Sequence, residues 1–380
     1  MPDTNLHPVH DTSGPPPEPG IALCLSGGGY RAMLFHAGCL WRLNQVGLLA
    51  RLNRISSVSG GSITAAVLGM NWRDLGLAPG VESARFQDLL VAPIRQLART
   101  TIDEGAIFGG VFLPGTVSEH VAGKYDQLLF HGKTLQDLPD EPRFVINATN
   151  VQSGALMRFS KPYIRDYMVG QILNPRLPLA LAVSASSSFP PVLSPCEIQV
   201  EKYGMRFEPA TSGETLNFPP YTTDLILTDG GVYDNLGLET AWKRYDTILV
   251  SDGGGHLAPE PSPHHDWARH AYRVLNLIDN QVGALRTRQV VTLFDQGERK
   301  GAYWGIRQNL ATYFNPYPLP CPPARTTALA LTPTRLAQVE EELQERLINW
   351  GYAICDAAIR RYFDQTLAPP AAFPYPAAGV

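Results

Sequence analysis

The sequence predicts an α/β protein with a central mixed, largely parallel sheet, and three observations lead to this prediction. Short runs of apolar and β-branched residues alternate with longer segments whose apolar residues recur at helical spacing. No segment repeats with a period of about 20–50 residues, which argues against a solenoid or a propeller. No break in composition divides the chain, so we expect one large domain with insertions.

The first two strand–helix pairs occupy the first 70 residues. Residues 21–25 are a short apolar run typical of a buried strand, and residues 30–46 carry apolar side chains at helical spacing. Gly47 follows this helix at the position of a C-cap glycine. Residues 55–58 are expected to form the next strand, and residues 62–70 the helix after it.

The remaining elements are spaced less regularly along the chain. Further strands are expected at residues 144–149, 225–228, 247–251 and 290–294. Strong helical patterns cover residues 267–285 and 336–362. Residues 105–115 are apolar but contain glycines and a proline, which favours a loop, and residues 202–223 are expected to be a surface insertion.

These patterns set the expected boundaries of the domain. Residues 1–19 are rich in proline and polar residues, so we expect a disordered lead-in. The domain is expected at residues 20–367, with its core at about residues 20–255 and a helical C-terminal part at about residues 260–367. Residues 368–380 combine proline and alanine without a periodic pattern, so we expect a flexible tail.

The composition argues against several classes of function and location. A formal net charge of -4 gives no global basic footprint, so nucleic-acid binding is not expected. No segment approaches the roughly 18–20 uninterrupted apolar residues of a membrane span, and the chain does not begin like a signal peptide. The five cysteines are scattered without a C-x-x-C pair, which argues against a disulfide framework or a zinc site. We therefore expect a cytoplasmic protein that contacts membranes only peripherally.

A candidate nucleophile lies at the junction of the second strand and its helix, in the run Ser57-Val58-Ser59-Gly60-Gly61. A sharp strand-to-helix turn exposes a serine hydroxyl above a sheet, and it requires small residues two places to either side. Gly61 and Ser57 meet that requirement, although the usual leading residue is glycine. Ser59 is therefore the candidate nucleophile. The alternative interpretation of Ser59 is the N-cap of the following helix.

A glycine-rich loop, Ser26-Gly27-Gly28-Gly29-Tyr30-Arg31, joins the first strand to the first helix. Its uncovered backbone N–H groups and the helix N-terminus favour an anion, either a phosphate or the oxyanion of acyl transfer. No Gly-Lys-Ser/Thr follows, and no clear acidic residue ends a second strand as in dinucleotide folds. The oxyanion interpretation is favoured because the next strand ends in the serine turn. The alternative is a phosphate-binding module that uses this loop alone.

A candidate base follows the expected strand at residues 225–228. Asp229-Gly230-Gly231 would bring a carboxylate out at a strand end, although Asp-Gly also occurs in ordinary turns. Among the histidines only His256, after another expected strand end, is a candidate general base for a Ser-His-Asp triad.

Taken together, SGGGYR, SVSGGS and DGG, in this order, resemble the motifs of the patatin-like phospholipases. The resemblance covers about residues 20–252 and includes Asn235, a segment at residues 147–150 similar to the family's central hairpin, and a small-residue, proline-bearing block at residues 185–191. It implies a three-layer α/β/α fold whose core, residues 20–255, is catalytic. The implied site consists of the nucleophile Ser59, the base Asp229, an oxyanion hole of Gly27, Gly28, Gly29 and Gly60, and Arg31 as loop support or phosphate contact.

The implied activity is hydrolysis of carboxylic esters of lipids, of phospholipase A, lysophospholipase or esterase type, through an acyl-enzyme and without metal or organic cofactor. The residues themselves imply only an activated acyl group. Transacylation by the same Ser-Asp dyad and a Ser-His-Asp esterase remain as alternatives. The partner would be a lipid or another acyl ester, with peripheral membrane contact, and the apolar residues 106–113 could form a lid or an ordinary buried loop.

Overall fold

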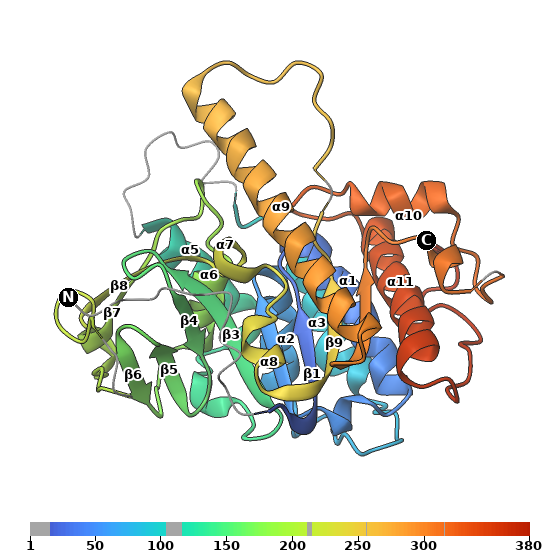
Figure 1. Cartoon of the computed structure of the whole chain (residues 1–380), viewed down its shortest axis with the longest axis horizontal. Helices are drawn as coiled ribbons and strands as arrows, with labels where there is room; N and C mark the ends of the chain where they lie inside the picture. Colours follow the sequence, from blue (N-terminus) through green and yellow to red (C-terminus); the bar gives the residue numbers. More distant parts are fainter. Residues whose placement is uncertain (1–15, 104–115, 211–214, 256, 315) are drawn as a thin grey trace.

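A computed structural model describes residues 16–103, 116–210, 215–255, 257–314 and 316–380. These residues contain one ten-stranded mixed sheet (Figure 1). Its strands are β1 Glu18–Leu25, β2 Arg54–Val58, β3 Arg143–Asn150, β4 Leu156–Phe159, β5 Tyr163–Asp166, β6 Gly170–Leu173, β7 Cys196–Gln199, β8 Asp224–Asp229, β9 Tyr245–Asp252 and β10 Lys300–Gly305. The helices include α1 Gly29–Gln45, α2 Gly60–Met70, α3 Ala92–Ala98, α5 Thr116–Tyr125, α6 Leu179–Ser186, α7 Gly231–Asp234, α8 Glu239–Trp242, α9 Trp267–Asp295, α10 Pro323–Ala330 and α11 Glu341–Ala358.

The sheet is parallel at its centre and antiparallel at one side. The order along its main path is β10-β9-β1-β2-β3-β4-β5-β6, and the strands from β10 to β3 are parallel. Strands β4, β5 and β6 continue it as an antiparallel meander, and β8 pairs antiparallel with both β3 and β7. The predicted mixed, largely parallel sheet is therefore confirmed.

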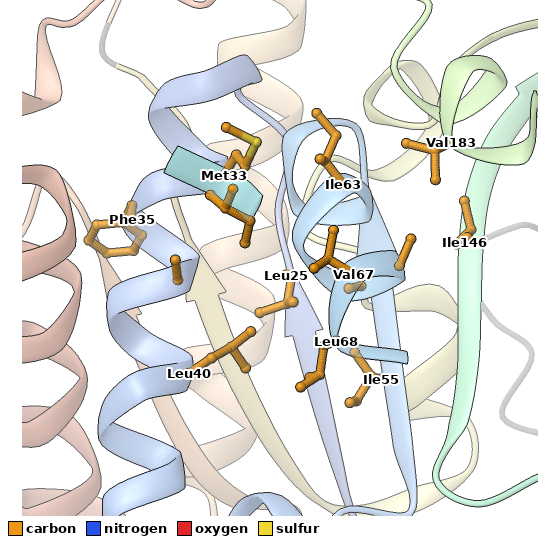
Figure 2. Packing of buried hydrophobic residues seen from close by; sticks show 14 of the residues in the cluster. Leu25, Met33, Phe35, Leu40, Ile55, Ile63, Val67, Leu68, Ile146 and Val183 are labelled. Atoms are coloured by element: carbon orange, nitrogen blue, oxygen red, sulfur yellow. The ribbon is translucent and has the colours of Figure 1, made fainter. Parts of the chain in front are cut away.

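Helices cover both faces of the sheet, which gives the three layers. Alternate residues of β1 face opposite sides: Leu23 and Leu25 enter the larger apolar cluster, whereas Ala22 and Cys24 enter a smaller one. The larger cluster lies between the sheet and a layer that contains α1, α2, α6 and α11. Figure 2 shows side chains of α1 and α2 packed over β1 and β2 in this cluster. The smaller cluster lies under α8 and the C-terminal part of α9.

The first helix ends where the sequence predicts. Gly47 has a φ of +65°, which favours glycine, and its N–H donates to the carbonyl of Asn44 at 2.9 Å. The N–H of Leu48 donates to the carbonyl of Leu43 at 2.9 Å, which completes a Schellman motif.

Two secondary-structure predictions in the C-terminal third are wrong. Residues 290–294, expected as a strand, form the last turns of α9, and the sheet's edge strand is β10 instead. The run Val-Val-Thr-Leu-Phe is short and apolar, so the spacing of its apolar residues does not distinguish a strand from a helix. In the structure Val290 and Phe294 pack on the smaller cluster from one face of α9. The helix expected at 336–362 begins only at Glu341, because Leu336 and Val339 make backbone hydrogen bonds with Ile102 and Ala98.

The C-terminal residues, expected as a flexible tail, pack against α1 and α11. The side-chain amide of Asn349 donates to the carbonyls of Tyr375 and Gly379 at 2.8 and 2.7 Å. Phe373 and Val380 are buried in the larger cluster. Aromatic residues between the prolines provide the apolar surface that fixes this segment.

Within the described residues, no helix is both long and apolar enough to cross a membrane.

Candidate active site

The strand register brings Ser59 and Asp229 together at the carboxyl end of β2. Val58, the last residue of β2, pairs with Asn147 of β3. The next residue of β3, Ala148, pairs with Asp229 at the end of the antiparallel strand β8. Strand β8 runs in the direction opposite to β2, so Asp229 reaches the carboxyl end of β2 from the other side. Its partner on β3 is the residue next to the partner of Val58, which precedes Ser59.

Ser59 occupies a strained turn between β2 and α2. Its φ of 51° and ψ of −121° lie where a non-glycine residue is rarely found, and such positions cost about 1–3 kcal/mol. Ser59 occupies the N-cap position of α2, but its side chain makes no capping hydrogen bond, so the alternative interpretation does not account for the hydroxyl. Its N–H instead donates to Ser186 Oγ at 3.0 Å. The backbone is therefore held in the geometry of a nucleophile elbow.

Asp229 is a buried carboxylate with one hydrogen-bonded oxygen and one oxygen without a partner among the described residues. Oδ1 accepts from the N–H of Gly231 at 2.7 Å, whereas Oδ2 has no hydrogen-bond partner among the described residues. Burial raises the pKa of Asp229 to about 7, against the lowering effects of the Gly231 N–H and the Ser59 hydroxyl. The hydroxyl is thus near the carboxylate without a well-formed hydrogen bond to Oδ2. Such bonds are often long before substrate binds.

A serine-rich segment at the end of α6 ties the nucleophile turn to the aspartate strand. Ser186 Oγ accepts from the N–H of Ser59 and donates to the carbonyl of Asn147 at 2.6 Å. The carbonyls of Ser186 and Ser188 accept from the N–H groups of Gly230 and Asp229, at 3.2 and 3.0 Å. The sequence marked this block only through the family resemblance. Its hydrogen bonds indicate that it fixes the separation of Ser59 and Asp229.

The glycine-rich loop lies directly beside the serine turn. A Cβ on Gly60 would come within 2.1 Å of the carbonyl oxygen of Gly29, so only glycine allows this approach. Gly29 and Gly60 are the first residues of α1 and α2, whose N–H groups have no partner within a helix. These two groups and the N–H of Gly28 donate to no backbone carbonyl among the described residues. They are free to face an oxyanion.

Gly27 was expected in the oxyanion hole with Gly28, Gly29 and Gly60, but it differs from them because its backbone N–H is already hydrogen-bonded. Its N–H donates to the carbonyl of Asn235 at 3.1 Å and is therefore not available to an oxyanion in this conformation. A Cβ on Gly27 would lie 2.3 Å from Asn235 Oδ1 and 3.1 Å from Ser59 Cβ. The absence of a side chain at Gly27 therefore makes room for Ser59 and Asn235.

Arg31 lies under the glycine-rich loop. Its Nε donates to the carbonyl of Gly253 at 3.1 Å, and Nη1 donates to the carbonyl of Thr332. A Cβ on Gly28, whose φ is +141°, would come within 2.8 Å of Nη2. Nη2 is buried and has no hydrogen-bond partner among the described residues, although Arg31 lines the cavity beside Ser59. The guanidinium thus packs on the loop and keeps one donor free.

Ser59 lies between two cavities of different character. One, of about 200 Å³, is mainly polar and also contacts Arg31, Asp229 and Arg307. The other, of about 150 Å³, is more apolar and is lined by Phe189, Pro190, Val192, Leu193 and Leu336, among others. An ester placed on Ser59 could therefore direct its two sides into two different environments.

The polar cavity also contains charged side chains outside the predicted catalytic site. Asp252, at the end of β9, accepts from the Tyr303 hydroxyl at 2.6 Å and pairs with Arg307 at 3.4 Å. Asp279 reaches the same cavity from α9, and burial raises its pKa to about 6. Asp252 follows an expected strand and precedes three glycines, which is a visible signal, whereas Asp279 and Arg307 come from distant segments and carry no local motif.

Among the described residues, no histidine lines either cavity around Ser59. His36 is buried in α1 and contacts Ser251 Oγ and the carbonyl of Ser26 at 2.8 and 2.9 Å. His264 and His265 are exposed. His256, the candidate base of a triad, and the apolar residues 106–113 lie outside the described residues. The described residues contain no group of three or more metal-ligating side chains arranged for a metal ion.

Solved structures similar to this chain include a human cytosolic phospholipase A2 and a Legionella pneumophila protein. Human GIVD cytosolic phospholipase A2 in complex with methyl gamma-linolenyl fluorophosphonate is 16% identical, with a TM-score of 0.49, over 89% of this chain and 57% of that one. The same enzyme without that inhibitor is 15% identical, with a TM-score of 0.40, over 66% and 48%. VipD from Legionella pneumophila is 14% identical, with a TM-score of 0.35, over 90% and 66%. The chain thus spans about half the length of the human phospholipase chains.

No curated protein matches the sequence significantly. The family described as patatin-like phospholipase matches residues 23–242, which is more than half of the chain and includes the glycine-rich loop, the serine turn and Asp229. The chain therefore belongs to the patatin-like phospholipase family.

Proposed function

We propose that the protein hydrolyses carboxylic esters of lipids through a Ser59–Asp229 dyad and an acyl-enzyme. The observation that carries this proposal is the free Oδ2 of Asp229, buried beside Ser59 and unpaired among the described residues. An unpaired buried carboxylate oxygen costs free energy, so a fold retains it only where another requirement outweighs that cost. Accepting the Ser59 proton is such a requirement, because the pKa of about 7 suits a general base at neutral pH.

In the proposed reaction, Asp229 takes the proton of Ser59 Oγ as this oxygen attacks the ester carbonyl. The N–H groups of Gly28, Gly29 and Gly60 stabilise the tetrahedral oxyanion, at about 3–4 kcal/mol per donor in a comparable hydrolase. Collapse of this intermediate transfers the proton from Asp229 to the leaving alcohol and forms the acyl-enzyme. Asp229 then takes a proton from the water that attacks the acyl-enzyme. Collapse of this second intermediate breaks the bond to Ser59 Oγ, returns the proton from Asp229 to that oxygen and releases the fatty acid.

The two cavities suggest how the substrate lies on Ser59. The apolar cavity fits the acyl chain, because burial there removes hydrocarbon from water. The polar cavity fits the alcohol side of the ester, and the free N–H of Arg31 could donate to a phosphate or ester oxygen there. Arg31 would thereby serve both as loop support and as a polar contact.

Product analysis tests the proposal. Purified protein would be incubated with phosphatidylcholine, a triacylglycerol and a p-nitrophenyl ester, and the products separated by chromatography. Free fatty acid from at least one lipid, absent with Ser59→Ala, is expected. New esters formed only when an alcohol is added would indicate transacylation, and binding of inorganic phosphate without turnover would indicate a phosphate-binding module.

The pKa of Asp229 gives a specific pH dependence. The base must be ionised, so kcat/KM for a p-nitrophenyl ester is expected to level off above a midpoint near pH 7 and to fall about tenfold per pH unit below it. A stopped-time assay from pH 5.5 to 8.5 measures this profile. The midpoint should hardly move with temperature, as for a carboxyl group, whereas a midpoint that falls with temperature would implicate a histidine.

The apolar cavity gives a prediction about chain length. Val192 lies in this cavity and is 40% exposed, so phenylalanine can replace it without disturbing the core while filling part of the cavity. Val192→Phe is expected to lower kcat/KM about tenfold for p-nitrophenyl esters of ten or more carbons and to leave the butyrate unchanged. Val151→Phe, at a similarly exposed position away from the cavity, is the matched control. Equal loss on both esters would place the acyl chain elsewhere.

A further inference from the structure

Helix α9 is long and has few contacts with the rest of the protein. Of its 29 residues only Val290 is buried, and it lies near the C-terminal end of the helix. Figure 1 shows α9 in orange crossing the front of the molecule, with its N-terminal end and the preceding loop projecting beyond the body. Packing against the rest of the protein therefore accounts for the apolar residues at the C-terminal end of α9, but not for those in its N-terminal half.

One face of α9 forms a wall of the candidate active site. Five residues of one helix face, at positions that recur about every turn, line the polar cavity: Tyr272, Asn276, the adjacent pair Asp279 and Asn280, and Gly283. Tyr272 also lines the apolar cavity. The helix therefore borders the space through which an ester reaches Ser59.

The opposite face of α9 carries an exposed apolar stripe. Its members are separated by seven, four and seven residues and are Trp267, Val274, Ile278 and Leu285, exposed by 84%, 39%, 56% and 59%. This spacing places them in one row along the helix, turned about half a revolution from the cavity face. Single exposed apolar residues are ordinary, but four in one row with a tryptophan at the projecting end mark an interaction surface.

The charges on α9 favour a binding partner whose surface carries little net charge. Three of its four arginines are already in ion pairs: Arg269 with Asp266, Arg273 with Glu260 and Arg286 with Glu239. The row is also narrow, since a stable protein interface uses roughly 20–30 residues a side. A lipid surface fits better than a protein partner, because its apolar interior accepts a single row of side chains and its polar layer accepts the flanking arginines.

We infer that α9 is an interfacial helix that docks the protein on a lipid surface through Trp267, Val274, Ile278 and Leu285. The face turned away from the lipid lines the catalytic cavity, so docking holds that cavity about one helix diameter, roughly 10 Å, from the lipid surface. The docking itself is independent of the proposed function. The inference rests on that function only in assigning the docking to lipid hydrolysis. Because apolar burial rather than charge supplies the binding, zwitterionic vesicles are expected to suffice.

Vesicle flotation tests the inference on a background that cannot consume lipid. Ser59→Ala protein would be mixed with phosphatidylcholine vesicles, with and without phosphatidylglycerol, and the floated fraction measured. The parent should float with both compositions, and Ile278→Asn with Leu285→Asn should lower the partition coefficient at least about tenfold. Val81→Asn with Val151→Asn, which changes equally exposed apolar residues elsewhere, should float like the parent.

Activity and size measurements complete the test. In otherwise wild-type protein, the Ile278→Asn, Leu285→Asn variant should hydrolyse soluble p-nitrophenyl butyrate at the parental rate but act more slowly on vesicles. A parent that does not float, or variants that float equally well, would overturn the inference. So would a dimer in sedimentation analysis that these variants dissociate, because the stripe would then bind a second copy. Flotation without ester hydrolysis would instead count against the proposed function alone.

Discussion

Replacing Ser59 with alanine is expected to lower kcat for ester hydrolysis by about 10³–10⁶-fold, the range that follows loss of a catalytic serine in comparable enzymes. Among the described residues, Ser59 is the only serine that lines both cavities beside Asp229, so no other hydroxyl is expected to replace it. The variant should keep the wild-type melting temperature within a few degrees, because the Ser59 side chain caps no helix. Steady-state hydrolysis of p-nitrophenyl butyrate and a thermal melt measure both quantities.

Ser57 provides the matched control for that experiment. It is the other serine of the turn, but its hydroxyl points to the carbonyl of Val145 and to Ser62. Ser57→Ala should retain activity within about tenfold of wild type, since it removes at most a supporting hydrogen bond. An active Ser59→Ala protein, or an inactive but folded Ser57→Ala protein, would contradict the assignment of the nucleophile.

Asp229→Asn is expected to lower kcat/KM by about 10²–10⁴-fold, because the amide cannot take the proton of Ser59. The same change should stabilise the fold above neutral pH. Burial raises the pKa of Asp229 to about 7 in the folded protein, above its ordinary value of 3.8. The folded state therefore holds the proton more tightly than the unfolded state. As pH rises from about 4 to 7, ionisation costs stability, and the full cost applies above pH 7.

Urea unfolding at two pH values measures this stabilisation. The free energy of unfolding of Asp229→Asn should exceed that of wild type by about 2 kcal/mol more at pH 8 than at pH 5. Asp224→Asn, at the exposed opposite end of β8, should change neither activity nor stability. A difference independent of pH would show that Asp229 is already ionised at pH 5, so its pKa would not be raised.

The sequence revealed the parts of the site that depend on local backbone chemistry. A glycine-rich loop before a helix and small residues around Ser59 are requirements of a few consecutive residues, so their pattern can be read directly. Gly47 at the end of α1 is predicted for the same reason, because its positive φ favours glycine.

The features that depend on tertiary packing were not predictable in this way. Nothing near Asp229 shows that β8 is antiparallel to β3, because alternation along a strand carries no direction. The N–H of Gly27 is hydrogen-bonded to the carbonyl of Asn235, which lies far from it in the chain. Arg307 and Asp279 likewise reach the polar cavity from distant segments. Residues 290–294 were misassigned because a five-residue apolar run suits a strand and a helix equally.

Covalent labelling tests the Ser59–Asp229 dyad most directly. The protein would be treated with an alkyl fluorophosphonate at pH values from 5.5 to 8.5, digested, and the modified peptide identified by mass spectrometry. The dyad predicts a single phosphonylated residue, Ser59, with a labelling rate that follows ionisation near pH 7 and falls at least about 10²-fold in Asp229→Asn. Labelling of a different residue, or of Ser59 at an unchanged rate in Asp229→Asn, would contradict it.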